Sequence, residues 1–200
     1  MGVETIKTFI HTNLNHMTIK IPCAAIVFAM FFQFSAQAQS GKTVQVGGEA
    51  MLPAKNIVQN AVNSKAHTTL VAAVKAAGLV ETLQGAGPFT VFAPVNDAFE
   101  NLPAGTVDNL LKPENKASLT KVLTYHVVAG KYDFKALSAM LKKGQNSLKT
   151  VSGGTLYFMM NGPRNIVVKD ENGNTANINT YDVYQSNGVI QSVDSVLLPK

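Results

Sequence analysis

The chain has 200 residues, of which 46% are hydrophobic and 14% are charged, and its formal net charge is +5 at pH 7. The basic residues are scattered, with Lys142-Lys143 the only basic doublet. A nucleic-acid-binding protein clusters Lys and Arg on one face with aromatic residues between them. The composition therefore argues against a nucleic-acid partner.

An apolar run near the N-terminus is typical of a secretory signal peptide. Residues 19–34 (IKIPCAAIVFAMFFQF) carry Lys20 near their start and precede Ala36-Gln37-Ala38, which has the form of a cleavage site. The run is shorter than the roughly 20 apolar residues of a membrane-spanning helix. We predict a signal peptide over residues 1–38 and export to the periplasm or the medium, with an uncleaved N-terminal anchor as the alternative and Met17 as a possible start.

Cleavage after Ala38 would leave a chain without cysteine and with two histidines, His67 and His126. Such a chain forms no disulfide and cannot assemble a zinc site of the usual Cys/His kind. About 160 residues suffice for one domain with a sizeable core. We predict a single domain with no metal and no cofactor.

The remaining chain is helical first and strand-rich later. Residues 39–51 are polar and contain glycine, and are predicted to be a flexible lead-in to a domain over residues 52–200. Apolar residues recur at helical spacing in residues 53–65, 67–79, 79–85, 102–112, 113–124 and 131–144. Strand patterns occupy residues 89–93, 125–128, 147–151, 155–160, 164–170, 175–180 and 188–193. Because helices and strands do not alternate regularly, the fold class is predicted to be α+β.

The stretch TVFAPVNDAF, residues 90–99, is predicted to form a strand-to-helix corner. Pro94 has no N–H to donate and ends the strand. Asn96 is a favoured helix N-cap, and Asp97 then lies in the first helical turn, where a negative charge is favourable. The alternative is catalytic, since a carboxylate beside an amide can do acid–base chemistry.

Three segments, taken together, resemble the signature boxes of fasciclin-type domains: GPFTVFAPVNDAF (87–99), LTYHVVAGKY (123–132) and NGVIQSVDSVLLP (187–199). The resemblance covers roughly residues 52–200. It implies a compact α+β fold in which helices pack on a wedge of β-strands, and an extracellular interaction domain rather than an enzyme. It also implies an adhesive role for the Tyr-His pair, here Tyr125 and His126.

The chain departs from the family pattern at two positions. Val95 stands where the family commonly has Thr, and Gln191 stands where the last box usually carries His. A proposal that relies on a histidine in the last box therefore fails for this chain. The domain occurs once here, so avidity would need an oligomer or a multivalent partner.

Catalytic and calcium-binding interpretations have weaker support. Tyr125, His126, Asp97 and Asp194 could form a hydroxyl–imidazole–carboxylate relay, but no G-x-S-x-G, phosphate loop or HExxH motif accompanies them. We predict instead that His126 is buried and bonded to the corner at residues 94–99. Residues 170–174 resemble a calcium loop, but the Asn-Gly pair within them favours a hairpin turn.

The leading hypothesis is an exported, non-catalytic adhesion domain that binds a protein or glycan at the cell surface or matrix. Its signature residues are Pro94, Asn96, Asp97, Tyr125, His126 and Asp194. The runner-up is a periplasmic or extracellular carrier of a small apolar or glycan ligand, and a hydrolase is third. An apolar pocket with convergent polar groups would favour the carrier, whereas a flat or edge-strand surface would favour adhesion. In TLYFMM (155–160), Met159 and Met160 must point to opposite faces, so we expect one of them to be less buried.

Overall fold

The computed structural model describes residues 43–200. The predicted signal peptide lies outside the described residues. The helices are α1 (Ile57–Ala61), α2 (Thr68–Ala77), α3 (Val80–Gln84), α4 (Asn96–Glu100), α5 (Thr106–Leu110), α6 (Lys116–Tyr125) and α7 (Phe134–Lys142), with the 3-10 turns η1 (Lys65–His67) and η2 (Pro113–Asn115). The strands are β1 (Val44–Val46), β2 (Glu49–Met51), β3 (Phe89–Pro94), β4 (Val127–Ala129), β5 (Ser147–Lys149), β6 (Thr155–Met160), β7 (Ile166–Lys169), β8 (Thr175–Gln185) and β9 (Gly188–Val193). The mixture confirms the α+β class.

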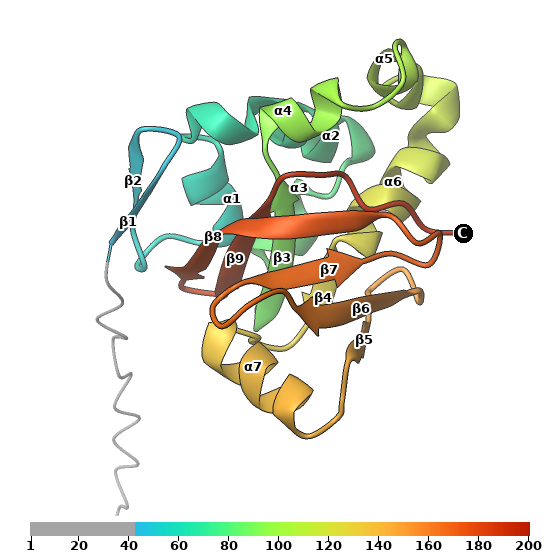
Figure 1. Cartoon of the computed structure of the whole chain (residues 1–200). Helices are drawn as coiled ribbons and strands as arrows, with labels where there is room; N and C mark the ends of the chain where they lie inside the picture. The colour runs from blue at the N-terminus through green and yellow to red at the C-terminus, as the bar shows by residue number, and fades with distance from the viewer. Residues whose placement is uncertain (1–42) are drawn as a thin grey trace, which may run out of the picture. The chain divides into compact units, whose positions relative to one another are not determined.

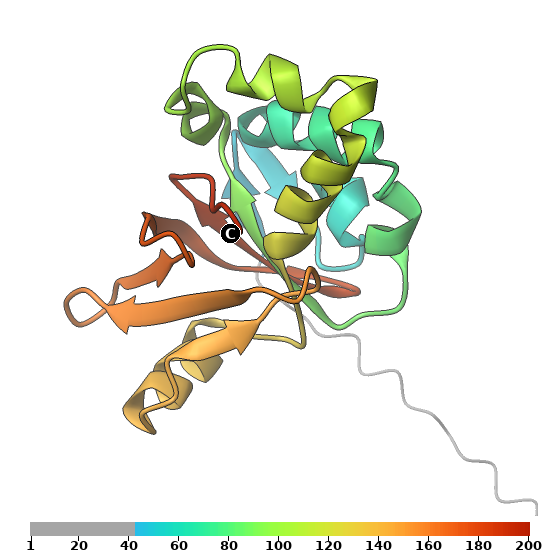
Figure 2. The same cartoon turned by 90° about the vertical axis from the view of Figure 1, so that its right-hand side faces the viewer.

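Seven strands form one sheet in the order β4-β3-β9-β8-β7-β6-β5. Strands β3 and β9 pair in parallel, and the other neighbouring strands pair antiparallel. Strand β8 changes register on β9 twice between Ile178 and Val183, and bulges of this kind bend a strand. Strands β5 to β7 therefore turn away from β3 and β9, and a wedge results (Figures 1 and 2).

Strands β3 and β4 separate two cores, because successive side chains on a strand point to opposite faces. Val91 and Val127 pack with residues of helices α1, α2, α3 and α6, whereas Phe92 and Val128 pack with residues of α7 and of strands β6 to β9. We call the first the helical core: Val46, Met51, Ile57, Val58, Leu70, Ala73, Val74, Ala77, Leu83, Val91, Ala93, Leu119, Leu123, Val127, Val183 and Ile190. We call the second the wedge core: Phe92, Tyr125, Val128, Leu137, Met140, Leu156, Phe158, Ile166, Val168, Ala176, Ile178, Val193 and Leu197.

The predicted flexible lead-in is wrong for residues 44–51, which form a β-hairpin. Val46 pairs with Glu49 across Gly47-Gly48, and both glycines have positive φ, as a two-residue hairpin turn requires. Val46 and Met51 are buried in the helical core. A Cβ at Gly47 would lie 2.5 Å from the backbone nitrogen of Ala66, so glycine also permits close packing of the hairpin on η1.

Two other boundaries differ from the prediction. Helix α1 covers only residues 57–61, because Asn56 caps it in a capping box with Gln59 and the chain turns again at Ser64. Tyr125 and His126, predicted to begin a strand, are the last residue of α6 and its C-cap. The helix α2 ends at Gly78 in the left-handed conformation, as predicted. Within residues 43–200, no helix is long and apolar enough to cross a membrane.

Candidate functional site

The three signature segments lie side by side in the sheet. Strand β3, from the first segment, pairs with β4 on one edge and with β9 on the other. The backbone N–H of Phe92 donates to the His126 carbonyl at 2.9 Å, and that of Val95 donates to the Val193 carbonyl at 3.1 Å. The motifs that are distant in sequence therefore form one structural unit.

Asn96 does not cap the helix in which it lies. The N-cap of α4 is Val95, and Asn96 is the first helical residue. Its side-chain oxygen instead accepts from the backbone N–H of Thr69 at 3.1 Å and from the Thr68 hydroxyl, and its amide nitrogen donates to the Lys65 carbonyl at 2.8 Å. Asn96 therefore caps α2, a neighbouring helix, and joins the corner to η1. Asp97 lies in the first turn of α4, as predicted, and is exposed.

His126 is buried, as predicted, but its side-chain partners are not those expected. Nδ1 lies 2.9 Å from the carbonyl oxygen of Val122, and Nε2 accepts from the backbone N–H of Leu197 at 3.0 Å. Since a carbonyl oxygen only accepts, the proton is assigned to Nδ1. The ring thus joins α6 to the C-terminal segment, and only its backbone carbonyl reaches the first signature segment. Burial lowers the pKa of His126 to about 4.

Tyr125 is buried in the wedge core, on the opposite side of the sheet from the helical core. Its hydroxyl donates to the Thr155 carbonyl at 2.8 Å and accepts from the backbone N–H of Glu171 at 3.0 Å. A Cβ at Gly154 would lie 2.6 Å from the ring, so the glycine is required for this packing. Burial raises the pKa of Tyr125 to about 12. The Tyr-His pair is therefore internal. A partner would not touch these two side chains, so any role of the pair in adhesion would be indirect, through the surface that it supports.

The remaining predicted site residues are also held by structural bonds. Asp194 accepts from both the backbone N–H and the side-chain amide of Asn177, each at 2.8 Å, and Pro94 is a buried residue at the end of β3. Because both ring nitrogens of His126 are bonded to backbone groups, the Tyr125–His126–aspartate relay is not formed.

The loop considered for calcium is a turn organised by Asp170. This carboxylate is buried and accepts from the backbone N–H groups of Asn172, Asn174 and Leu198. Its lone pairs are thus directed at backbone donors. No group of three or more His, Cys, Asp or Glu that could hold a metal is found in the part of the chain that the structure describes.

Gln191, the other departure from the family pattern, is a buried linker. Its amide nitrogen donates to the Tyr132 carbonyl at 3.0 Å and to Asp182, and its oxygen accepts from the backbone N–H of Asp182 at 3.0 Å. Asp182 has a φ of 58°, which is unusual for a residue other than glycine. The amide, which presents a donor and an acceptor at once, thus holds the bend of β8.

His67 was missed by the sequence reasoning, and it forms a second buried network. Nδ1 lies 2.9 Å from the Ser64 hydroxyl, and Nε2 lies 3.3 Å from the Ser192 hydroxyl. The Ser64 hydroxyl also bonds to the Val46 carbonyl, and a further hydrogen bond joins the His67 ring to the backbone of Ala93. Burial lowers the pKa of His67. Only its position at the start of a predicted helix hinted at this role.

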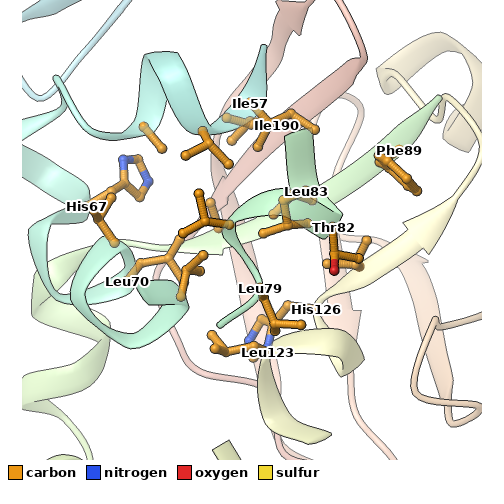
Figure 3. Close-up of a pocket in the computed structure, with 18 of the residues that line it drawn as sticks. Ile57, His67, Leu70, Leu79, Thr82, Leu83, Phe89, Leu123, His126 and Ile190 are labelled. Atoms are coloured by element: carbon orange, nitrogen blue, oxygen red, sulfur yellow. The ribbon is translucent and has the colours of Figure 1, made fainter. Parts of the chain in front are cut away.

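The helical core contains a cavity of about 70 Å³. Side chains from α1, α2, α3, β3 and α6 converge on it, and His67 and His126 lie on different sides of it (Figure 3). The apolar residues that line it are Met51, Ile57, Val58, Ala61, Leu70, Val71, Val74, Leu79, Val80, Leu83, Phe89, Val91, Phe92, Ala93, Leu123, Val127, Val151 and Ile190. The polar ones are His67, Lys75, Thr82, Thr124 and His126.

A different feature lies on the surface of the wedge. Tyr157, Met159 and Met160 of β6 are exposed by 37%, 41% and 41%. Tyr157 and Met159 share one face of the strand, and we call these two residues the β6 patch. The expectation that one methionine would be less buried than the other is wrong, because the strand ends at Met160 and both faces are open there. Lys169, across from Tyr157 on β7, places its ammonium 5.9 Å from the tyrosine ring centre.

Known proteins resemble this chain over most of its length. The sequence matches the fasciclin domain family over residues 65–199. Protein sll1483 of Synechocystis is 46% identical over 158 residues, which cover 79% of this chain and 81% of that protein. The cell surface glycolipoprotein MPB83 of Mycobacterium bovis is 32% identical over 183 residues, covering 89% and 74%. The pig transforming growth factor-beta-induced protein ig-h3 is 37% identical over 132 residues, but these cover only 17% of it.

The fold has a counterpart among solved structures. A FAS1 domain pair from the insect cell adhesion molecule fasciclin I superimposes with a TM-score of 0.63 at 17% identity, over 72% of this chain. The chain spans about half of that pair (51%). The family match covers more than half of the chain, and a relative that is 46% identical is covered over 81% of its length. The chain is a member of the fasciclin domain family.

Proposed function

We propose that this protein is an exported adhesion domain that binds a protein or glycan partner through the β6 patch, without catalysis. The relatives include a cell surface glycolipoprotein and a cell adhesion molecule, which supports a cell-surface or adhesion-type role. The proposal assigns this role to one surface of the present chain, the β6 patch. It includes cleavage of residues 1–38 and delivery of the domain to the periplasm or the medium.

The β6 patch is the observation that carries the proposal. In the described part of the chain, six large apolar residues are exposed, and three of them lie within residues 157–160. Grouped exposed apolar side chains are typical of interaction surfaces, and tyrosine and methionine are enriched in them. Methionine also adapts its shape to a partner. The buried Tyr125 helps to position this strand, since its hydroxyl bonds to Thr155, the first residue of β6.

Capture from the organism's own envelope and matrix fractions tests this proposal. The protein is immobilised beside a Tyr157→Ser/Met159→Ser variant and a matched Val62→Ser control. Val62 is an exposed apolar residue at the C-terminal end of α1, a helix on the other side of β3 from β6 in Figure 1. The wild type and the control should capture the same partner, and the double variant should retain less than about a tenth of it, the loss expected for a residue at the centre of an interface.

The double variant must first show the wild-type circular dichroism and melting temperature. Pretreatment of the fractions with a protease or with glycosidases identifies whether the partner is a protein or a glycan. Equal capture by the double variant and the wild type would contradict the proposal that the β6 patch is the binding surface.

A second function, an extracellular carrier of a small apolar ligand, is favoured by the cavity in the helical core. Almost all of its lining is apolar, with a few polar side chains, as is typical of small-molecule sites. Its volume of about 70 Å³ is well below that of sites for drug-sized ligands. A carrier would therefore hold only part of its ligand inside the core. No residue of β6 lines the cavity, so the two functions can be tested separately.

A further inference from the structure

The polar side chains deepest in the cavity are already satisfied by the protein. His67 is bonded to Ser64 and Ser192, and both nitrogens of His126 are bonded to backbone groups. A water molecule inside an apolar cavity needs two to four polar partners, and without them such a cavity stays dry. The interior is therefore suited to hydrocarbon.

The lining also reaches the surface. Lys75, Thr82 and Val151 line the cavity and are at the same time exposed to solvent. Lys75 is the one Lys, Arg, Asp or Glu of the lining, and burial lowers the pKa of both histidines there. Its ammonium has no hydrogen-bond or ion-pair partner among residues 43–200. The opening thus presents an uncompensated positive charge beside an apolar interior.

The volume limits how much hydrocarbon can enter. A dry apolar cavity of about 150 Å³ accommodates benzene, so a cavity about half as large accommodates roughly three carbons. Val151, which lines the cavity and is 49% exposed, offers further apolar surface to a chain that extends out of the cavity. A linear chain fits this arrangement better than a ring.

We propose that the cavity binds a fatty-acid-type ligand, with the end of its alkyl chain inside the helical core and its carboxylate paired with Lys75. This inference rests on the carrier function proposed above and names its ligand class. An anionic head complements the unpaired ammonium of Lys75, and Thr82 is a further exposed polar residue of the lining. A ligand with a cationic head would meet repulsion from Lys75, and a ligand with a neutral head would gain nothing from it.

Calorimetric titration of the full chain with linear alkanoates, alkanols and alkylamines of matched chain lengths tests the inference. For alkanoates, affinity should rise about four-fold per added methylene and then level off once the cavity is filled. At one chain length, the alkanoate should bind about five-fold more tightly than the alkylamine, as for an exposed ion pair. The Lys75→Glu variant should reverse this preference.

A variant in which a larger side chain fills the cavity provides a second test of the same inference. Val74→Phe places a larger side chain in the lining and should abolish binding of all three ligand series. Ala72→Phe, on the exposed face of the same helix, is the matched control and should bind as the wild type does. If Val74→Phe fails to fold, the charge reversal at Lys75 still decides the question.

The outcomes separate this inference from the carrier function. Binding of alkanols and alkanoates with equal affinity would keep the carrier function and overturn the anionic ligand class. Absence of binding in all three series would overturn both. A preference for alkanoates that persists in Lys75→Glu would overturn the assignment of Lys75. The adhesion test at the β6 patch is independent of all three results.

Discussion

The two cores of this protein are built differently, although one sheet separates them. The wedge core contains the aromatic residues Phe92, Tyr125 and Phe158, each no more than 2% exposed, and Phe92 and Phe158 contact each other with ring centres 5.4 Å apart. The buried residues of the helical core are aliphatic, and they enclose the cavity. The comparison teaches that the two residues of the signature pair serve different cores: Tyr125 belongs to the closed wedge core, whereas His126 lines the cavity of the helical core.

The largest expected effect is in the wedge core. Tyr125→Ala removes a fully buried ring and two hydrogen bonds to its hydroxyl, and should lower the free energy of unfolding by about 3–5 kcal/mol. Leu70→Ala, in the lining of the existing cavity, should cost less, about 2 kcal/mol, because fewer neighbouring atoms lose contacts. Urea denaturation of both variants measures the difference. Equal losses would show that the two cores are equally well packed.

The second prediction concerns pH. The folded-state pKa of His126 is about 4, below its ordinary value of 6.5, so the unfolded state takes up the proton first as the pH falls. Stability is therefore fully present above about pH 6.5 and is lost as the pH falls to 4, by up to about 3 kcal/mol. The pKa of His67 is also lowered. Protonation of His67 therefore also reduces the free energy of unfolding as the pH falls.

The variants His126→Gln and His67→Gln separate the two contributions. Each should be less stable than the wild type at pH 7.5, with a weaker pH dependence between pH 6.5 and 4. Urea denaturation at several pH values provides the measurement. A slope unchanged in His126→Gln would mean that this histidine is not the buried neutral base that the structure describes.

Adding one methylene to each core tests whether the two cores differ in how tightly they are packed. Val168→Ile enlarges a fully buried residue in the wedge core and should destabilise the protein by about 1–3 kcal/mol through overpacking. Val74→Ile, which adds a methylene in the cavity lining, should be neutral or stabilising. Thermal unfolding of the two variants is the measurement. Destabilisation by Val74→Ile as large as by Val168→Ile would contradict the presence of usable space in the helical core.

The smallest effect is expected where the signature corner meets the helices. Asn96→Ala removes the cap of α2 and the bond to the Lys65 carbonyl, and should cost about 1 kcal/mol. Asn96→Asp keeps the accepting oxygen and should recover part of this loss. Hydrogen exchange of the Thr69 amide reports the cap directly. Unchanged exchange in Asn96→Ala would indicate that another group caps α2.

Much of the architecture was predictable, because local signals carry it. Helix α2 ends at Gly78, the strand β3 ends at Pro94, and the Asn172-Gly173 pair joins β7 to β8, as the sequence indicated. The hairpin at residues 44–51 was missed, although two glycines between apolar residues are a hairpin signal. Its short strands are ordered by burial of Val46 and Met51, a condition that depends on distant residues.

Partners of polar side chains were much less predictable. Asn96 is a residue type that commonly caps helices, and its side chain does accept from a backbone N–H at a helix start. The helix that it caps is α2, not α4. His126 was correctly expected to be buried, yet its ring bonds to Leu197, 71 residues away. A favourable hydrogen bond needs only the right donor at the right distance, and sequence spacing does not encode that distance.

By itself, the sequence determined the order of helices and strands, the α+β class and the three signature segments, because periodicity, proline and glycine act over a few residues. Only the tertiary structure decided that the Tyr-His pair is internal, that both methionines of β6 are exposed, and that a cavity with a mostly apolar lining lies in the helical core. These properties depend on which surfaces remain uncovered after distant segments pack. Packing is a sum over contacts between segments far apart in the chain, so no short stretch of the sequence contains it.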